Sequence, residues 1–314
     1  MPDGDQVSRS SGGYEYPKAF MRKLRENFYR WLCTALAGAS LLFLVGITIV
    51  LFSEGLPVLR TVSIGSFLSG TAWYPTHEPA EFGILPLIMA SAWVTIGALL
   101  ICVPLGIGSA LYIHELASPR QRSVLKPLIE LLAAIPSIVF GLFGIMVVAP
   151  FLQTALNLPT GLCALTASIV LGIMGIPFIT SIADDALSFV PRSFKEASYA
   201  LGANRWQTLT KVVIPAAGSG ISTAIILGMG RIVGETMTVL MVAGGAAVIP
   251  TSFTQPVRPM TATIAAEMGE AAMGSPHYHS LFAIGLVLFI ITLAGNMTAE
   301  VIARKYRLKL GLNR

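Results

Sequence analysis

The sequence predicts an all-α polytopic membrane protein with six transmembrane helices. Of its 314 residues, 54% are hydrophobic and only 12% are charged, and the mean hydropathy is +0.73. Soluble domains carry about 25% charged residues, so most of this chain is expected to lie in a membrane. Its apolar runs extend over about 20 residues, which is the length of a helix that crosses the hydrocarbon core, whereas barrel strands alternate over about 10. We therefore expect helices rather than a barrel.

Six apolar runs divide the chain. A polar tail at 1–29 precedes the first transmembrane helix at 30–53, whose apolar run is longer than that of a signal peptide and is therefore expected to stay. A loop follows at 54–81, and a membrane domain is predicted at 82–308. The apolar runs themselves cover 31–52, 82–113, 127–152, 158–183, 219–243 and 280–302.

The positions of the basic residues predict the orientation. Only Arg60 and Arg258 lie in the connections on one side, Arg231 lies within a span, and the rest of the 21 Lys and Arg residues lie on the other side. Because Lys and Arg accumulate in cytoplasmic connections, both termini and the 184–218 loop are predicted to be cytoplasmic, and the 54–81 loop extracytoplasmic. This bias also explains the net charge of +5 without nucleic acid as a partner. The expected location is the plasma (inner) membrane.

The fifth span contains two charges. Arg231 lies near its middle, where an ionised side chain costs at least ~2.5–3.5 kcal/mol, and Glu235 follows four residues later on the same predicted helical face. One interpretation is an internal ion pair that satisfies both groups. The other is a transiently hydrated path in which the guanidinium holds an anion with two parallel hydrogen bonds. Gly230 and Gly234 form a G-x-x-x-G pair, which predicts close packing against another helix.

The 184–218 loop predicts a helix–turn–helix in which Gly202 ends the first helix. Glu196-Ala197-Ser198, followed after three residues by Gly202 and later by Pro215, resembles the EAA loop of bacterial ABC importer permeases, E-A-A-x3-G-x9-I-x-L-P. Ser198 departs from the alanine of that pattern. In the family this loop is the coupling helix that docks on an ATPase subunit. The resemblance implies that Glu196, Ala197, Ser198 and Gly202 couple this chain to an ATPase.

Four further segments are similar to the phosphate-specific ABC importer permeases of the PstC type. They are FGILPLI at 82–88, IELLAAIPSIVFGLFGIMVVAP at 129–150, GRIVGETM at 230–237 and ATIAAEMGEA at 262–271. The resemblance covers about residues 60–305 and implies a type I ABC importer permease fold. It also implies a translocation pathway at Arg231 and Glu235. The implied partners are a second, PstA-type permease, an ATPase dimer, an extracytoplasmic phosphate-binding protein and membrane lipid.

The sequence predicts a non-catalytic subunit. A Walker A loop needs Gly-Lys followed by Ser or Thr, and none of the lysines follows a glycine, so ATP and Mg²⁺ are expected on a partner ATPase. We expect no cofactor on this chain, and the three cysteines show no metal-ligand spacing. Two alternatives stay open. One is a permease for another oxyanion, such as molybdate or sulfate, and the other is a proton-coupled secondary anion transporter in which Glu235 carries the proton.

The third span contains a candidate gate. Glu130 lies near its cytoplasmic end, and Pro136 and Ser137 follow at a position where proline frees a backbone carbonyl. A kinked packing helix and a gate are both compatible with this pattern.

Asp184 and Asp185 are predicted to be a solvated helix end, and His114, His277 and His279 to be solvated loop-edge residues. The 244–279 connection is expected to hold a short helix within its Ala/Met/Glu-rich part.

Overall fold

The computed structural model describes residues 16–309, with side chains placed for 27–301 and Arg304. Among these residues, six helices are long and apolar enough to cross a membrane, which confirms the all-α, six-helix prediction. They are Asn27–Arg60, Leu85–Leu116, Ser137–Ala155, Ala164–Ser188, Arg205–Val233 and Pro276–Val301. Part of the predicted N-terminal tail, residues 1–15, lies outside the described residues.

Two compact units make up the chain, Met1–Leu51 and Phe52–Arg314. In the first unit a single helix, α1 (Tyr16–Gly55), starts inside the predicted polar tail and runs to the start of the second unit. The helix therefore begins earlier than the apolar run that predicted it. Hydropathy reports the part of a helix that suits lipid, and a helix continues beyond that part as long as its backbone hydrogen bonds are satisfied.

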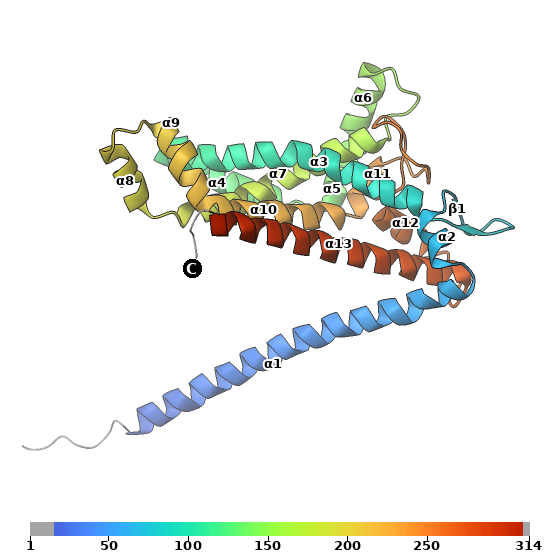
Figure 1. Ribbon diagram of the computed structural model, residues 1–314, viewed down its shortest axis with the longest axis horizontal. Coiled ribbons are helices and arrows are strands. Elements are labelled where there is room, and N and C mark those ends of the chain that lie inside the picture. The colour runs from blue at the N-terminus through green and yellow to red at the C-terminus, as the bar shows by residue number, and fades with distance from the viewer. Residues whose placement is uncertain (1–15, 310–314) are drawn as a thin grey trace, which may run out of the picture. The chain divides into compact units, whose positions relative to one another are not determined.

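Four long helices form the bundle of the second unit (Figure 1). Helix α7 (Ala164–Ser188) packs along α3 (Leu85–Leu111) and α10 (Ile214–Val233), and α10 packs in turn on α13 (Pro276–Lys309). Small residues allow α3 and α7 to approach closely, since a Cβ atom on Gly106 would lie 2.9 Å from Ile179. The Thr180 hydroxyl also donates to the Gly106 carbonyl at 3.1 Å. Helix α7 is thus the centre of the core.

One end of the second unit carries the short elements between Gly55 and α3, and those that precede α13 (Figure 1). These are η1 (Leu56–Arg60), α2 (Ile64–Ser69), the antiparallel strands β1 (Trp73–Tyr74) and β2 (Glu81–Phe82), and α12 (Met260–Glu267). Glu267 joins them, because its carboxylate accepts hydrogen bonds from the Trp73 indole at 3.1 Å and from Arg258 at 2.6 Å. His277 lies 2.9 Å from the same carboxylate, so it is not the solvated residue that the sequence predicted. Helix α12 confirms the short helix expected in this connection.

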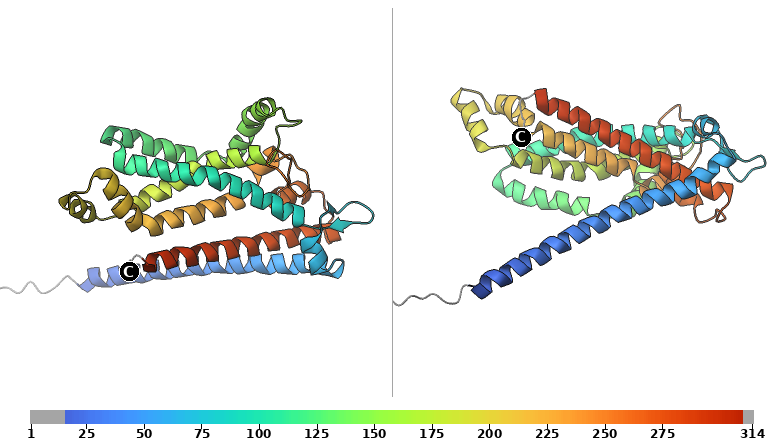
Figure 2. Two further views of the ribbon diagram at one scale, coloured as in Figure 1. Left: turned by 45° about the horizontal axis from the view of Figure 1, so that its top comes forward. Right: turned by 60° about the horizontal axis from the view of Figure 1, so that its bottom comes forward.

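The opposite end carries the elements that follow α3 and α7. They are η2 (Tyr112–Leu116), α4 (Pro119–Ala133), α8 (Arg192–Ala200), α9 (Arg205–Thr208) and η4 (Leu209–Val213), the last of which continues into α10. Figure 2 shows the same elements from two further sides. We call this the α8 end of the second unit.

The third predicted span, 127–152, is not one helix. It comprises the second half of α4, a break at Pro136, and then α5 (Ser137–Phe143), η3 (Gly144–Val148) and α6 (Ala149–Ala155). Pro136 is the N-cap of α5 with extended backbone angles, φ −59° and ψ 140°. Proline disfavours helical angles in the residue before it, so the chain leaves α4 before Pro136 and the membrane-spanning helix begins at Ser137.

The fourth and fifth predicted spans also change. Helix α7 begins at Ala164 rather than 158 and runs beyond 183 to Ser188. Gly161 precedes it at a close approach, where a Cβ atom would collide with the Ala149 carbonyl oxygen. The fifth span was predicted to be continuous over 219–243, but α10 ends at Val233 and a separate helix, α11 (Met237–Val242), follows.

Candidate functional site

The interruption between α10 and α11 is where the predicted charge pair lies. Gly234 ends α10, its N–H donating to the Gly230 carbonyl at 3.2 Å, and the Glu235 N–H donates to the Ile232 carbonyl at 3.2 Å. Glycine has low helix propensity, and the Glu235 carboxylate accepts from the first-turn N–H of Thr238 at 3.4 Å, which favours a new helix start. Arg231 is therefore in the last turn of α10, whereas Glu235 lies beyond it. The prediction that both charges share one continuous helical face was wrong.

Arg231 is exposed, and its guanidinium carbon lies 5.2 Å from the centre of the Phe178 ring on α7. A cation above an aromatic face is stabilised without its N–H donors being consumed. Among the side chains that the structure describes, Arg231 forms no ion pair, and Glu235 in particular does not pair with it. The interpretation of an internal Arg231–Glu235 ion pair is therefore not what this structure contains. The donors of Arg231 are available to another group.

Thr238 connects this site to the candidate gate. Its buried hydroxyl donates to the Ser137 carbonyl at 2.9 Å and lies 3.4 Å from the Glu235 carboxylate. On the other side, the Thr261 hydroxyl of α12 donates to the Glu235 carbonyl at 2.9 Å. The start of α5, the α10–α11 break and α12 thus meet at one point. Sequence analysis missed both threonines, because in a membrane helix a threonine usually bonds its own backbone and carries no separate signal.

The predicted gate residues separate into two groups. Pro136 and Ser137 lie at this meeting point, while Glu130 is exposed on α4 and lines a small cavity with Lys126 and Asp184.

Only one glycine of the predicted G-x-x-x-G pair faces another helix. A Cβ atom on Gly230 would face Asn296 of α13 at 3.9 Å, whereas one on Gly234 would meet only carbonyls of its own helix.

The predicted helix–turn–helix is present at the α8 end. Gly202 follows α8 with φ +83°, a conformation that glycine adopts at no steric cost. Its N–H donates to the Tyr199 carbonyl at 2.9 Å, and the Ala203 N–H donates to the Ser198 carbonyl at 3.2 Å, the two bonds of a Schellman helix end. Asn204 then caps α9 reciprocally with Gln207. We call α8, α9 and the turn between them the α8–α9 hairpin.

Of the four predicted coupling residues, three face outward and one holds the hairpin together. Glu196, Ala197 and Gly202 are exposed. Ser198 is 9% exposed, and its hydroxyl lies 2.9 Å from that of Thr208, which is 1% exposed. The departure from the family's alanine therefore has a buried polar partner. Beside the exposed residues the hairpin forms an open groove of about 550 Å³, at whose edge Leu201 is 89% exposed.

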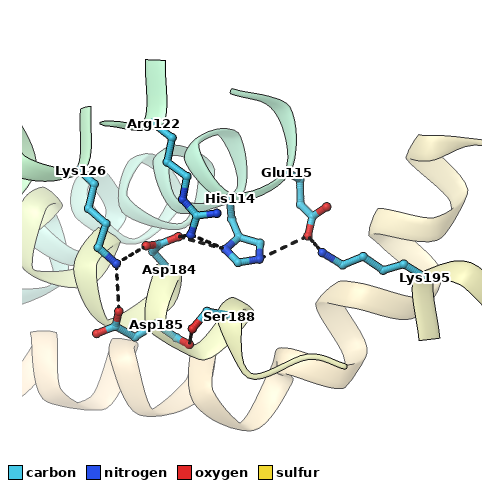
Figure 3. A network of polar contacts seen from close by, with 8 residues as sticks. All are labelled: His114, Glu115, Arg122, Lys126, Asp184, Asp185, Ser188 and Lys195. Carbon is cyan, nitrogen blue, oxygen red and sulfur yellow. Dashed lines mark hydrogen bonds and ion pairs between the residues drawn. The ribbon is translucent and has the colours of Figure 1, made fainter. Parts of the chain in front are cut away.

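A polar network also occupies the α8 end, as Figure 3 shows. Asp184, with its side chain 4% exposed, accepts from Lys126 at 2.8 Å and lies 3.5 Å from Arg122 of α4. His114 Nδ1 lies 3.1 Å from Asp184, and Lys195 of α8 pairs with Glu115 beside it. The hydrogen bond to Asp184 raises the pKa of Lys126, which therefore stays charged at neutral pH. The full set, which we call the ion-pair network, is His114, Glu115, Arg122, Lys126, Asp184 and Lys195.

The ion-pair network corrects the prediction that Asp184 and His114 are solvated. Helix α7 continues to Ser188, so Asp184 lies inside the helix and faces α4 instead of forming its solvent-exposed end. Asp185, at the next position, is exposed as predicted, although it still contacts Lys126 at 3.3 Å. The sequence placed Asp184 outside only because it ended the helix about one turn too early.

Comparison with known proteins places this architecture in a family. Residues 102–308 match the family described as "Binding-protein-dependent transport system inner membrane component". The chain is 41% identical to the Bacillus subtilis "Probable ABC transporter permease protein YqgH", over 86% of this chain and 88% of that protein. It is 40% identical to the "Phosphate transport system permease protein PstC" of Mesorhizobium japonicum, over 86% and 87% of the two chains.

Solved structures share the fold at lower identity. The permease fold of a bacterial alginate ABC transporter matches with a TM-score of 0.64 at 15% identity, over 90% of this chain and 96% of that chain. The MetNI methionine ABC transporter, in an inward-facing conformation, matches with a TM-score of 0.54 at 21% identity, over 71% and 94%. The six apolar helices, the α8–α9 hairpin and these matches lead to one conclusion: the chain belongs to the family of inner-membrane components of binding-protein-dependent transport systems.

Proposed function

We propose that this chain is the permease subunit of an ATP-driven phosphate importer in the plasma (inner) membrane, with both termini cytoplasmic. The observation that carries the proposal is the exposed α8–α9 hairpin, whose residues keep the EAA spacing, in a chain related to PstC phosphate permeases over most of its length. The groove and the exposed Leu201 beside Glu196 and Ala197 support docking of an ATPase. In this proposal a PstA-type permease supplies the other half of the pathway, and an extracytoplasmic binding protein delivers phosphate.

ATP is hydrolysed on the partner in this proposal. An ATPase dimer binds ATP and Mg²⁺, and this non-catalytic subunit receives the resulting movement through the α8–α9 hairpin. From α9 the chain continues through η4 into α10 as one helix from Arg205 to Val233, whose last turn holds Arg231. A displacement of the hairpin therefore reaches Arg231 along a single helix.

The chemistry of Arg231 fits an anion on the pathway. Its donors are not taken up by Glu235, whose carboxylate is held by Thr238 instead. Inorganic phosphate offers paired oxygens that match the guanidinium fork. The ring of Phe178 stabilises the cation without using its N–H donors, so these donors stay available to the anion.

The test is uptake of radiolabelled phosphate in cells that lack other phosphate transporters. Wild type should restore uptake, and Arg231→Gln should reduce it by about 10- to 150-fold, the worth of hydrogen bonds to a charged group. The matched control is Arg60→Gln, another exposed arginine, which should leave uptake unchanged. Equal amounts of co-purified ATPase would show that both variants assemble. Uptake by Arg231→Gln at the wild-type rate would show that Arg231 has no role in the translocation pathway.

The same cells distinguish the two alternatives. The guanidinium fork also fits sulfate and molybdate, so selectivity must be measured directly. If the chain transports phosphate selectively, an excess of either anion should not reduce the uptake of radiolabelled phosphate. A proton-coupled secondary transporter would continue to accumulate phosphate after ATP depletion when the proton gradient is clamped. We expect uptake to stop, because the energy enters at the α8–α9 hairpin.

A further inference from the structure

The ion-pair network forms a bridge between α8 and helices outside its own hairpin. Lys195 of α8 pairs with Glu115 of η2, the segment that continues α3. His114 lies 3.8 Å from Glu115 and 3.1 Å from Asp184 of α7, which contacts Lys126 of α4 at 2.8 Å. Figure 3 shows these side chains arranged in one row between α8 and α4.

Apart from this bridge, α8 packs mainly on α9 and η4, and the buried Ser198–Thr208 hydroxyl pair joins it to α9. Between η2 and the hairpin lies an open cavity of about 740 Å³, lined by Glu115 on one side and by Tyr199 and Trp206 on the other. Glu115, the partner of Lys195, therefore lies at the edge of a space that packing does not fill. The hairpin does not need this pair to keep its own shape.

The burial of the bridge makes it stiff. The side chains of Glu115 and Lys195 are 16% and 20% exposed, so separating them would leave two charges incompletely hydrated. The cations of Arg122, Lys126 and Lys195 are opposed by the carboxylates of Glu115, Asp184 and the neighbouring Asp185. A balanced set of this kind keeps its partners together when one of its helices moves.

The bridge and α10 both connect α8 to the α10–α11 break. From Lys126, helix α4 runs to Ala133 and the break at Pro136, after which the Ser137 carbonyl accepts the hydrogen bond of Thr238. A movement of α8 therefore has two paths to the α10–α11 break. One runs through α9, η4 and α10 to Arg231, and the other runs through the ion-pair network and α4 to the opposite side of the break.

We propose that Lys195 and Glu115 are positioning residues that couple the movement of α8 to α3, α7 and α4, so that ATP hydrolysis and phosphate transfer stay in step. This inference rests on the proposed function. Without the pair, α8 can still bind the ATPase and follow it, but only the α10 side of the break moves with it. ATP would then be hydrolysed with less phosphate transferred for each ATP.

The test uses the complete transporter, with its second permease, ATPase and binding protein, reconstituted in lipid vesicles. Phosphate accumulation and ATP hydrolysis are measured together for Lys195→Glu, Glu115→Lys and the double exchange. Each single variant should lower phosphate moved per ATP by at least about fivefold while the ATPase still co-purifies, and the double exchange should restore most of the ratio. Arg120→Glu, an exposed position on α4 with the same change of charge as Lys195→Glu, is the control and should keep the wild-type ratio.

Two results would overturn the coupling role: single variants with the wild-type ratio, or a double exchange as defective as the singles. A general loss of folding would lower both activities together and would not be repaired by exchanging the charges. The proposed function fails separately, when wild-type vesicles hydrolyse ATP but accumulate no phosphate. Accumulation by wild type together with unaffected single variants contradicts the coupling role alone.

Discussion

The buried Ser198–Thr208 hydroxyl pair is predicted to stabilise the packing of α8 on α9, and substitutions at these two residues test this. Ser198→Ala restores the family's alanine but removes the partner of the Thr208 hydroxyl, which is 1% exposed and 2.9 Å away. A buried polar group left without its partner costs about 1–3 kcal/mol. Replacing both residues, in Ser198→Ala with Thr208→Val, removes both polar groups and should cost little, since the remaining shapes are similar.

Hydrogen exchange measures this cost locally. The N–H groups of Gly202 and Ala203 close the end of α8 and exchange when the hairpin opens. In purified protein in lipid nanodiscs, Ser198→Ala should exchange these amides about 5- to 150-fold faster than wild type, which corresponds to the same 1–3 kcal/mol. Ser193→Ala is the control, because Ser193 is exposed on the same helix.

The double variant distinguishes hydrogen bonding from side-chain volume as the source of this cost. If the cost comes from an unsatisfied hydroxyl, exchange in the double variant should return to near the wild-type rate. A double variant that exchanges as fast as Ser198→Ala would show that volume, not hydrogen bonding, holds the hairpin. An unchanged rate in Ser198→Ala would show that Thr208 finds another partner at no cost.

Substitutions at two further positions test the turn and the helix break. Gly202→Val should weaken ATPase co-purification by about 5- to 30-fold, because φ +83° costs a residue with a side chain about 1–2 kcal/mol. Gly202→Asn should retain most of the co-purified ATPase. Equal amounts of ATPase with the two variants would contradict this explanation. Thr238→Val removes the bond to the Ser137 carbonyl and should reduce phosphate uptake, while Thr238→Ser should preserve it. Uptake that is equal in the two Thr238 variants would mean that this hydroxyl does not hold the site together.

The sequence could predict the elements that depend on local chemistry. Six spans followed from hydropathy, because the bilayer fixes how long an apolar helix must be. The α8–α9 hairpin followed from Gly202, because few other residues adopt the backbone angles that end α8. In both cases the determining interactions lie within a few residues of one another.

The rest depends on partners far apart in the sequence. Asp184 is buried because α4 brings Lys126 to it, and nothing near Asp184 in the sequence indicates that. The break after Val233 could be suspected from Gly234, but the sequence also supports a continuous apolar helix there. What stabilises the break is the hydrogen bond from Thr261 to the Glu235 carbonyl and that from Thr238 to Ser137.

The break changes what the two charges are expected to do. On a continuous helix, Arg231 and Glu235 would keep a fixed separation, and one would simply neutralise the other. Here Arg231 belongs to the helix that starts at the α8–α9 hairpin, whereas Glu235 is tied through Thr238 to α5 and through Thr261 to α12. We therefore expect their separation to change when the hairpin moves. In the proposed function, we expect an anion bound to Arg231 to be released as Glu235 approaches, because the carboxylate then competes with the anion for the donors of Arg231.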